Sequence, residues 1–570
     1  MDSSDNYSNN KYAYVIICLA IIAFNLRAIW GFDGLLEDDQ MHYYLLSSGH
    51  YDWGIMKRVL FAPIFLYYIH QLFLISVLWS RLAVVLFFML PCSSVLFYLF
   101  RNIFRIPFII SVSAAIFPFI LPGQNNIPTY CTGSYFFPAL LFGLLALTFG
   151  LNYFITQKAR TVYLSASVIC YFLAIECSEL FALMIPVYLF AFFAYRKFIW
   201  KNIYPVIFFV LLSSYKIITT LINPWGGKNS AANHILPETI INRLKHSFYY
   251  MNPFGLNKNS FWIYLLLIIF IIAGIYLNFK TPERLFTGEK DKVSHPFSSC
   301  SKMVWSIYAF AVLWTVCSMV PFIFLSQDFS SRYLFIASIG LNLILCLSFF
   351  PVFQMISVKK INGAAIIFTG LLIFAGINRD MALEKQFGPL NQKFQNTRSY
   401  IKKVQLPKNA QLILTSKNNY FEYLGAGVFY KSSGSLRHML GRSDISGQIM
   451  FENNYYDPFL ITGNAWMNRN SELNISYPSF LFRTNAFAKD DYSRLEYVLQ
   501  WKDKNSMNSD WTIYKLDKNS GKTSGFIKGT GWTEYNKSID SLKNTGISRD
   551  MIMFGGIPSQ QDSIRLKLKR

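Results

Sequence analysis

The chain has 570 residues, of which 53% are hydrophobic, 18% aromatic and only 15% charged. Soluble globular proteins carry about 25% charged residues, so this composition excludes an ordinary soluble protein. The net charge of +22 is spread over many loops, with one short basic cluster at residues 565–570. This distribution argues against a nucleic-acid partner and favours membrane lipids with anionic headgroups.

Two regions of unlike composition follow one another along the chain. Residues 12–377 consist mainly of apolar stretches, and stretches of roughly 17–25 apolar residues can cross a bilayer as helices. We expect eleven such spans, at residues 12–30, 81–100, 107–121, 135–156, 161–175, 179–195, 203–222, 261–278, 303–325, 333–353 and 361–377. Residues 378–570 are polar. The chain is therefore divided into a multi-span membrane module, 1–377, and a soluble domain, 378–570.

One further apolar stretch, residues 59–78, decides on which side every later loop lies. If this stretch lies along the membrane surface, fourteen Lys and Arg residues fall in cytoplasmic loops and seven in the opposite loops. If it crosses the membrane, the distribution is inverted. Because cytoplasmic loops carry the excess of Lys and Arg, we predict a surface helix, an internal N-terminus and an external C-terminal domain. The first apolar segment is predicted to be a retained anchor, since no small-residue cleavage site follows it.

The first predicted external loop contains three adjacent acids, Glu37-Asp38-Asp39. Neighbouring carboxylates repel one another, which raises the pKa of at least one of them, and a raised pKa suits a general base. His42 follows Asp38 by four residues and would share its face on a helix. Asp is also favoured at helix starts. Both a catalytic and a capping role are therefore open.

A second external segment, residues 223–260, is predicted as a long loop that carries function. Trp225 offers a flat face to a sugar ring, and Lys228 or Arg243 a cation to a phosphate. Aromatic residues of such a loop also mark the bilayer interface. Two further acids, Glu176 and Glu179, stand at the outer end of a span; intramembrane acids are commonly functional, but the predicted topology places these in an aqueous turn.

The soluble domain is predicted to be α/β or mostly β. Short apolar or alternating stretches at residues 410–415, 495–501 and 511–516 are typical of strands and are separated by Asn, Asp, Gly and Ser. Sustained helical periodicity is too scarce for a helical bundle. The fold class predicted for the whole chain is a polytopic α-helical membrane protein with a C-terminal extracytoplasmic domain, which we expect to recognise an acceptor.

Several segments resemble the amino-terminal module of GT-C fold glycosyltransferases. They are residues 37–44, Pro63 with the surface helix, Ser80-Arg81-Leu82-Ala83 and Leu99–Phe104. The turn Ser331-Arg332-Tyr333-Leu334 is similar to an Arg-Tyr-Leu element before a late span in the same family. Members of that group, such as the protein mannosyltransferases and the aminoarabinose transferase of lipid A, place an Asp-Glu or Asp-Asp motif in the first external loop. The motif here is Glu-Asp-Asp, which leaves the choice of base between Asp38 and Asp39 open.

The resemblance implies an inverting glycosyltransferase in a bacterial inner membrane, with its active site on the periplasmic side. It would move a sugar from a polyprenyl (undecaprenyl-type) phosphate donor to a glycan or lipid-linked acceptor such as O-antigen. Asp38 or Asp39, next to Glu37, would deprotonate the acceptor hydroxyl, and Arg332 would hold the donor phosphate. Arg332 could equally be an interfacial anchor.

We expect no cofactor, although Glu37, Asp38 and Asp39 could hold a divalent cation, as the acidic motif does in some members of that group. No His/Cys cluster predicts a zinc or iron site. The alternatives are an O-antigen polymerase or ligase and a lipid-glycan transporter or flippase. A transporter should show paired halves with matching broken helices, which the sequence lacks.

Overall fold

The computed structural model describes most of the membrane module and separate segments of the C-terminal region. The described residues are 3–35, 38–47, 68, 71–72, 74–122, 136–156, 159–194, 203–222, 237–251, 261–281, 300–323, 334–354, 363–402, 411–416, 429–451, 460–462, 465–467, 481–483, 497–501, 511–516, 523–527, 531–535, 552–556 and 563–567. The chain forms two compact units. The first comprises Met1–Asp33 and Asp52–Asn391, and the second comprises Gly34–Tyr51 and Gln392–Arg570.

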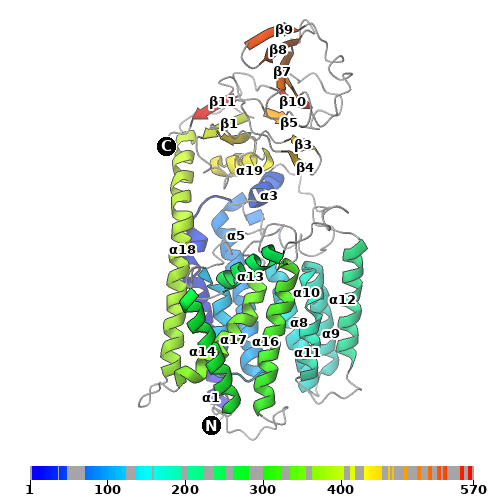
Figure 1. Ribbon diagram of the computed structural model, residues 1–570, viewed down its shortest axis with the longest axis vertical. Coiled ribbons are helices and arrows are strands. Elements are labelled where there is room, and N and C mark those ends of the chain that lie inside the picture. The colour runs from blue at the N-terminus through cyan, green and yellow to red at the C-terminus, as the bar shows by residue number, and fades with distance from the viewer. Residues whose placement is uncertain are drawn as a thin grey trace. The chain divides into compact units, whose positions relative to one another are not determined.

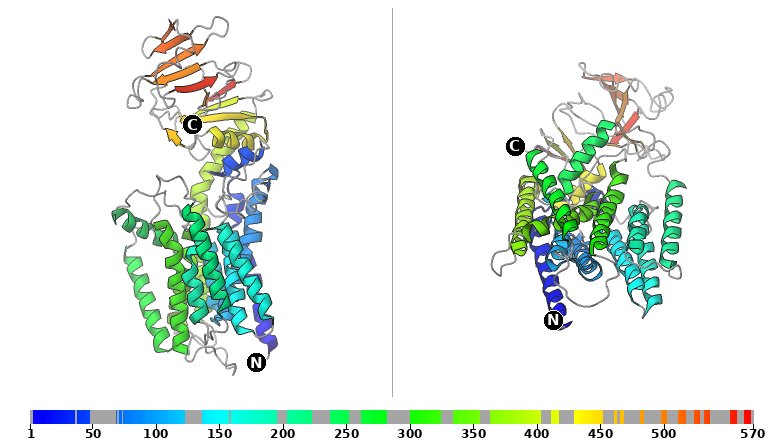
Figure 2. Two further views of the ribbon diagram at one scale, coloured as in Figure 1. Left: turned by 90° about the vertical axis from the view of Figure 1, so that its right-hand side faces the viewer. Right: turned by 60° about the horizontal axis from the view of Figure 1, so that its bottom comes forward.

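The first unit is a bundle of apolar helices (Figures 1 and 2). Its helical elements are α1 (Ser3–Ala23), α2 (Leu26–Trp30), α5 (Val77–Val84), η2 (Val85–Met89), α6 (Leu90–Tyr98), η3 (Leu99–Ile103), α7 (Phe108–Ile116), η4 (Phe117–Phe119), α8 (Phe136–Ile155), α9 (Arg160–Cys177), α10 (Leu180–Leu183), α11 (Ile185–Ala194), α12 (Tyr204–Ile222), α13 (Pro237–Met251), α14 (Phe261–Lys280), α16 (Cys300–Ile323), α17 (Phe335–Gln354) and α18 (Gly363–Lys402). The last of these continues into the second unit.

Eight helical segments in the described part of the chain are long and apolar enough to cross a membrane. They are Lys11–Trp30, Val77–Ile103, Phe136–Ile155, Arg160–Cys177, Tyr204–Ile222, Lys302–Ile323, Phe335–Gln354 and Gly363–Asn396. Shorter apolar helices lie at Phe108–Phe119, Ile185–Ala194 and Leu265–Lys280. Each of the eleven predicted spans coincides with one of these segments. The chain has the architecture of a multi-pass membrane protein. In the predicted surface helix at 59–78, the structure describes residues 68, 71–72 and 74–78, of which the last two belong to α5.

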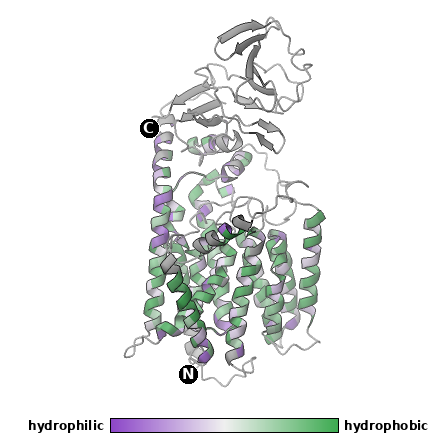
Figure 3. Ribbon diagram, viewed as in Figure 1, coloured by the Kyte–Doolittle hydropathy of each residue, from purple (hydrophilic) through white to green (hydrophobic). Residues whose placement is uncertain are grey.

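The outer faces of the bundle are apolar, as the green ribbons of Figure 3 show. On α12, Leu211, Ile218 and Leu221 are 60%, 55% and 74% exposed, and on α14 Ile272 is 61% exposed. Contiguous apolar surface of this kind is rare on soluble monomers. It suits contact with lipid tails, which are as apolar as the side chains themselves.

Glycines allow two helix pairs of the bundle to approach closely. A Cβ atom on Gly274 of α14 would lie 1.8 Å from the Ser348 carbonyl oxygen of α17, and one on Gly340 of α17 would lie 2.3 Å from the Ala311 carbonyl oxygen of α16. Small residues at helix contacts are the usual means of tight association in membranes. The α14–α17–α16 layer therefore depends on two positions that accept no side chain.

A buried polar network joins the first and last spans. Arg379 of α18, 1% exposed, donates to the Leu121 carbonyl at 2.8 Å and to the Asn25 side-chain oxygen at 3.0 Å. The Asn25 amide nitrogen donates in turn to the carbonyls of Ile21 and Phe119 at 2.8 and 3.3 Å. Asn25 stands where α1 ends and α2 begins, so the network satisfies backbone carbonyls that the helix break leaves open.

The second unit combines helices with three sheets. It contains α3 (Asp38–Ser47) and α19 (Phe429–Leu440), with strands β1 (Gln411–Ser416), β2 (Ser446–Phe451), β3 (Leu460–Thr462), β4 (Ala465–Met467), β5 (Leu481–Arg483), β6 (Tyr497–Trp501), β7 (Trp511–Leu516), β8 (Thr523–Ile527), β9 (Gly531–Tyr535), β10 (Ile552–Gly556) and β11 (Ser563–Lys567). The sheet orders are β11-β1-β2, β5-β10-β6-β7-β8-β9 and β3-β4. The first is parallel, with α19 between β1 and β2 in the chain, and the six-stranded sheet is antiparallel.

The three predicted strands are present as β1, β6 and β7. The division between units differs from the predicted boundary at 377/378. It falls at Asn391/Gln392, inside α18, and places Gly34–Tyr51 with the C-terminal region. The apolar pattern stops near residue 377 but the helix does not, because the polar continuation still contains good helix formers such as Ala, Leu, Glu and Lys.

The end of α19 is a complete Schellman motif. Gly441 has φ +66°, its N–H donates to the His438 carbonyl at 3.3 Å, and the Arg442 N–H donates to the Arg437 carbonyl at 3.1 Å. The chain can therefore turn at once into β2.

Replacing Gly441 by alanine should destabilise the second unit by about 1 kcal/mol, because an L-residue in the left-handed region is strained. A Cβ atom there would meet nothing within 4 Å, so the cost is conformational rather than steric. Hydrogen exchange of the 429–451 segment in the full chain measures it. Gly370→Ala, in the equally open but ordinary helical setting of α18, should be neutral or slightly stabilising. Equal protection in Gly441→Ala and the unmodified chain would contradict this account.

Candidate functional site

The acidic motif opens a helix of the second unit. α3 begins at Asp38, so the acids stand at the positive end of the helix dipole, where negative charge is stabilised. Asp39 and His42 are buried, at 1% and 3% exposure. An Asp side chain is seldom so deeply buried unless it is engaged by other groups. Glu37 lies outside the described residues.

One face of α3 packs on α19. The contacts involve Gln40, Tyr43, Tyr44 and Ser47, spaced i, i+3, i+4 and i+7, which is the spacing of a single helix face. On α19 they involve Gly434, Arg437 and His438. The backbones meet at Gly434, where a Cβ atom would lie only 1.8 Å from the Gln40 carbonyl oxygen. A residue with a side chain therefore has no room at position 434.

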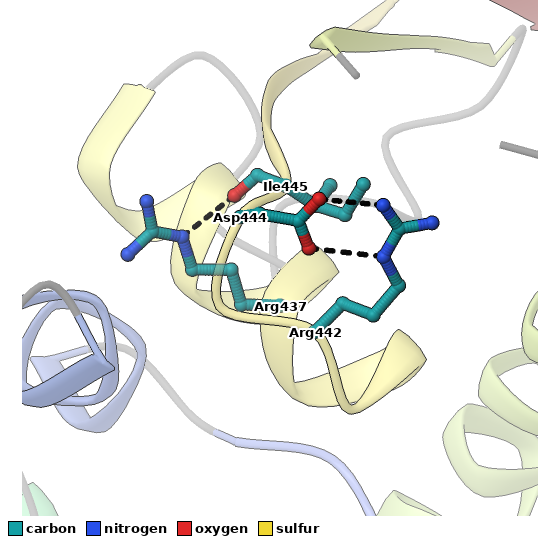
Figure 4. Close-up of polar contacts among 4 residues, drawn as sticks. All are labelled: Arg437, Arg442, Asp444 and Ile445. Atoms are coloured by element: carbon teal, nitrogen blue, oxygen red, sulfur yellow. Dashed lines mark hydrogen bonds and ion pairs between the residues drawn. The ribbon is translucent and has the colours of Figure 1, made fainter. Parts of the chain in front are cut away.

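Arg437 holds the two helices together, and Figure 4 shows its contact with Ile445. Its Nε donates to the Ile445 carbonyl at 2.6 Å, and its Nη1 donates to Ser47 Oγ at 2.9 Å and to the Tyr44 carbonyl at 3.4 Å. Its guanidinium lies 4.4 Å from the centre of the Tyr44 ring. Burial lowers the pKa of Arg437, and Tyr44, Tyr43 and Asp444 partly oppose that shift. This one side chain ties α3, α19 and the start of β2 together.

The turn that carries Ile445 is itself braced. Arg442 and Asp444 form a two-pronged ion pair, with Nε to Oδ1 at 3.0 Å and Nη2 to Oδ2 at 2.5 Å (Figure 4). The carboxylate raises the pKa of Arg442. Because both side chains are about a third exposed, the pair orients the turn rather than adding much stability.

An aromatic cluster completes the α3–α19 contact. The His438 ring lies 5.3 Å from Tyr43 in an edge-to-face arrangement and 6.0 Å from Phe394, on the last part of α18, in a stacked one. Burial raises the pKa of Tyr43, while nearby Arg437 lowers it. The acid-bearing helix is thus anchored by ring contacts as well as by hydrogen bonds.

Arg243 occupies a different setting in the first unit. The predicted loop at 223–260 contains a helix, α13, that crosses the ends of α16 and α17 (Figure 1). Arg243 donates to the carbonyl of Ile323, the last residue of α16, at 2.8 Å, which is a helix-capping contact. The prediction of a loop is wrong for residues 237–251, which form α13. Pro237 stands at the first helical position, where proline favours the start of a helix. Three other predicted residues, Trp225, Lys228 and Arg332, lie outside the described residues.

A buried ion pair joins α9 to α12. Lys216 Nζ lies 2.9 Å from Glu176 Oε2, and both side chains are 3% exposed. One turn away, the Tyr171 hydroxyl lies 2.6 Å from Ser213 Oγ and donates to the Phe181 carbonyl at 3.1 Å. The expectation of an aqueous turn is wrong for Glu176, because its carboxylate is buried in an ion pair with Lys216 of α12.

Sequence reasoning missed Lys216 and Arg437 as partners. Lys216 carried a signal, since it is a single ionisable residue within a predicted span. Arg437 carried none, because nothing in its local sequence points to α3. Within the described residues no group of three or more His, Cys, Asp and Glu side chains gathers at one place. The divalent cation at Glu37, Asp38 and Asp39 stays a prediction, since Glu37 lies outside the described residues.

No protein-family model and no curated protein sequence matches the chain. Among solved structures, the oligosaccharyltransferase of Archaeoglobus fulgidus is similar in its apo form, with a TM-score of 0.40 and 12% identity over 76% of this chain and 64% of that one. The structure of the same enzyme tethered by a disulfide to an acceptor peptide with the NVT sequon has a TM-score of 0.36 and 13% identity. That match covers 76% of this chain and 63% of the other. The chain thus spans less than two thirds of that protein's length. TM-scores below 0.5 do not establish a common fold.

Proposed function

We propose that the protein is an inverting glycosyltransferase that moves a sugar from a polyprenyl phosphate donor to an extracytoplasmic glycan or lipid-linked acceptor. The observation that carries the proposal is the acidic pair Asp38-Asp39 at the start of α3, a helix that Arg437 and the close approach at Gly434 hold in place. A general base needs this kind of support, because a displacement of about 1 Å can cost a hundredfold in rate.

The chemistry needs few groups. One carboxylate takes the proton of the acceptor hydroxyl while that oxygen attacks the anomeric carbon, and the bond to the donor phosphate breaks with inversion. The departing polyprenyl phosphate requires a cation rather than an acid. We propose Arg332 for this role and leave Lys228, Trp225 and Arg243 as candidates for holding the substrate, with Arg243 already engaged at the end of α16.

The proposal predicts that Asp38→Asn or Asp39→Asn lowers sugar transfer at least about a hundredfold, because a positioned general base contributes about 10²–10⁴. The measurement is transfer of radiolabelled sugar from a panel of polyprenyl phosphate donors to cell-envelope glycan by the purified full chain. Asp380→Asn is the matched control: Asp380 is 54% exposed and lies 4.0 Å from Arg27 at the bundle surface. It should transfer normally.

Retained donor binding with lost transfer in one of the two variants would assign the base. Normal sugar transfer by both variants would show that Asp38 and Asp39 have a structural role only, and would contradict the proposal.

A transporter or flippase for a lipid-linked glycan is the second candidate. One observation favours it, the ion pair Glu176–Lys216 inside the bundle, since intramembrane charges commonly mark transport pathways. A chain in which both residues are replaced by apolar ones should keep sugar transfer if the pair is structural. Loss of a glycan-translocation activity in that variant would favour the transporter.

A further inference from the structure

An open pocket with a volume of about 360 Å³ lies in the first unit between α1, α6, α8 and α9, and is called the cavity below. This volume falls at the lower end of the range for small-molecule sites, about 300–1,000 Å³. Its polar lining residues are Tyr14, Ser94, Tyr98, Thr148, Asn152 and Tyr163. Val95, Leu145 and Phe149 line the remainder. A membrane-embedded cavity with this mixed lining suits a ligand that is polar at one end and apolar at the other.

Thr148 is the strongest sign that the cavity is a binding site. Its side chain is 5% exposed, and its hydroxyl has no hydrogen-bond partner among the described residues. Two buried hydroxyls on the other helices of the pocket are satisfied: Ser93 on α6 donates to the Ala115 carbonyl and Ser167 on α9 donates to the Ala146 carbonyl, each at 2.7 Å. Leaving a buried hydroxyl unpaired costs about 1–3 kcal/mol. A ligand atom in the cavity would remove that cost.

Three basic residues outside the pocket lining follow or precede a lining tyrosine along the chain. Lys11 precedes Tyr14 on α1, and Arg160 precedes Tyr163 on α9. Arg101 lies in η3, three residues after Tyr98 at the end of α6, and donates to the Ile106 carbonyl at 3.3 Å. In each case the separation is three residues, so the basic group lies one turn from a cavity tyrosine on nearly the same face. α1 and α9 begin at this end of the bundle, where Figure 1 marks the N-terminus, and α6 and α8 end there.

The arrangement matches a phosphate with an apolar tail. Phenol hydroxyls and guanidinium groups are strong donors to phosphate oxygens. The Arg160 guanidinium is already placed 5.9 Å from the centre of the Tyr153 ring on α8, which limits its freedom. The positive-inside prediction puts this end on the cytoplasmic side, where anionic lipids attract basic groups.

We propose that this cavity binds the headgroup of an anionic glycerophospholipid. The phosphate would meet Lys11, Arg101 and Arg160; the hydroxyls or esters of the glycerol would bond to Thr148, Asn152 and the tyrosines; and the acyl chain would leave along Phe149. This site is separate from the acidic motif on α3 and does not depend on the proposed transfer reaction.

Binding of tritiated phosphatidylglycerol to the detergent-solubilised full chain tests the proposal. Thr148→Val, which keeps the shape and removes the hydroxyl, and Arg160→Gln should each weaken binding about tenfold, since Thr148→Val leaves a buried glycerol oxygen unpaired and Arg160→Gln removes a cation from the phosphate. Thr148→Ser should restore it, which separates loss of the hydroxyl from misfolding. The matched control is Tyr276→Phe, since Tyr276 with Lys280 forms a similar tyrosine–cation pair on α14 that lies outside the cavity. It should bind normally.

Competition distinguishes the source of the phosphate. Unlabelled phosphatidylglycerol should displace the label, while phosphatidylcholine and inorganic phosphate should not. Displacement by inorganic phosphate as effective as by phosphatidylglycerol would overturn the lipid assignment. Undecaprenyl phosphate competing better than phosphatidylglycerol would overturn the choice of a glycerophospholipid, and unchanged binding in Thr148→Val would remove the site.

Discussion

Replacing Lys216 by methionine should destabilise the first unit by about 3–5 kcal/mol, because it leaves the Glu176 carboxylate buried without its cation. The two side chains are 2.9 Å apart and 3% exposed, so water reaches neither. Thermal unfolding of the detergent-solubilised chain, followed by intrinsic fluorescence, measures the change. Lys280→Met at the exposed end of α14 is the control and should alter stability by no more than about 0.5 kcal/mol.

The double variant Glu176→Leu with Lys216→Met should recover most of the lost stability. Removing both charges removes both desolvation costs, and well-packed apolar replacements of buried pairs are often neutral or stabilising. The two residues are in contact, so a double-mutant cycle should give a large coupling energy. If Lys216→Met unfolds at the same temperature as the unmodified chain, the ion pair does not stabilise the first unit. The same conclusion follows if the loss of stability in the double variant equals the sum of the losses in the two single variants.

Replacing Gly434 by alanine should separate α3 from α19 and abolish most of the proposed sugar transfer. The new Cβ atom would stand 1.8 Å from the Gln40 carbonyl oxygen, and a backbone group cannot swing aside as a flexible side chain can. Overpacking costs about 1–3 kcal/mol, and we expect a value at the upper end. Hydrogen exchange of residues 38–47 reports the separation, and the transfer assay reports its consequence for Asp38 and Asp39.

Gly370→Ala on α18 is the matched control, because a Cβ atom there meets nothing within 4 Å. It should leave exchange of α3 and sugar transfer unchanged. Faster exchange of α3 in Gly434→Ala with normal transfer would show that the position of α3 does not govern the reaction. Unchanged exchange would show that α3 is not held by this contact.

Helix α3 both carries the acids of the proposed reaction and packs against α19 of the second unit. Arg437, Ser47 and the Gly434 contact fix the helix that carries Asp38 and Asp39. The C-terminal region therefore has a use beyond the acceptor recognition expected from its aromatic residues: it positions the acid-bearing helix. In the proposed reaction, Arg437 would be a positioning residue that acts on Asp38 and Asp39 through α3.

The sequence alone determined the membrane spans, because the length and apolarity needed to cross a bilayer are properties of one continuous stretch. Eight of the eleven expected spans coincide with described helices long enough to cross a membrane, and the other three coincide with shorter apolar helices. It also located three strands, whose alternation of apolar and polar residues is equally local, and it singled out the acids that open α3. It did not reveal α19 or the helix in the 223–260 segment as structural elements.

Only the tertiary structure decided which of these elements belong together. The acidic segment, which lies between the first spans in sequence, is grouped with the C-terminal unit through Gln40–Gly434 and Ser47–Arg437, about 390 residues apart. Glu176 pairs with Lys216, 40 residues away, and Arg379 donates to Leu121, 258 residues away. No periodicity in either partner encodes such pairs. They arise because buried charges and close-packed backbones must be satisfied by whatever the folded chain brings beside them.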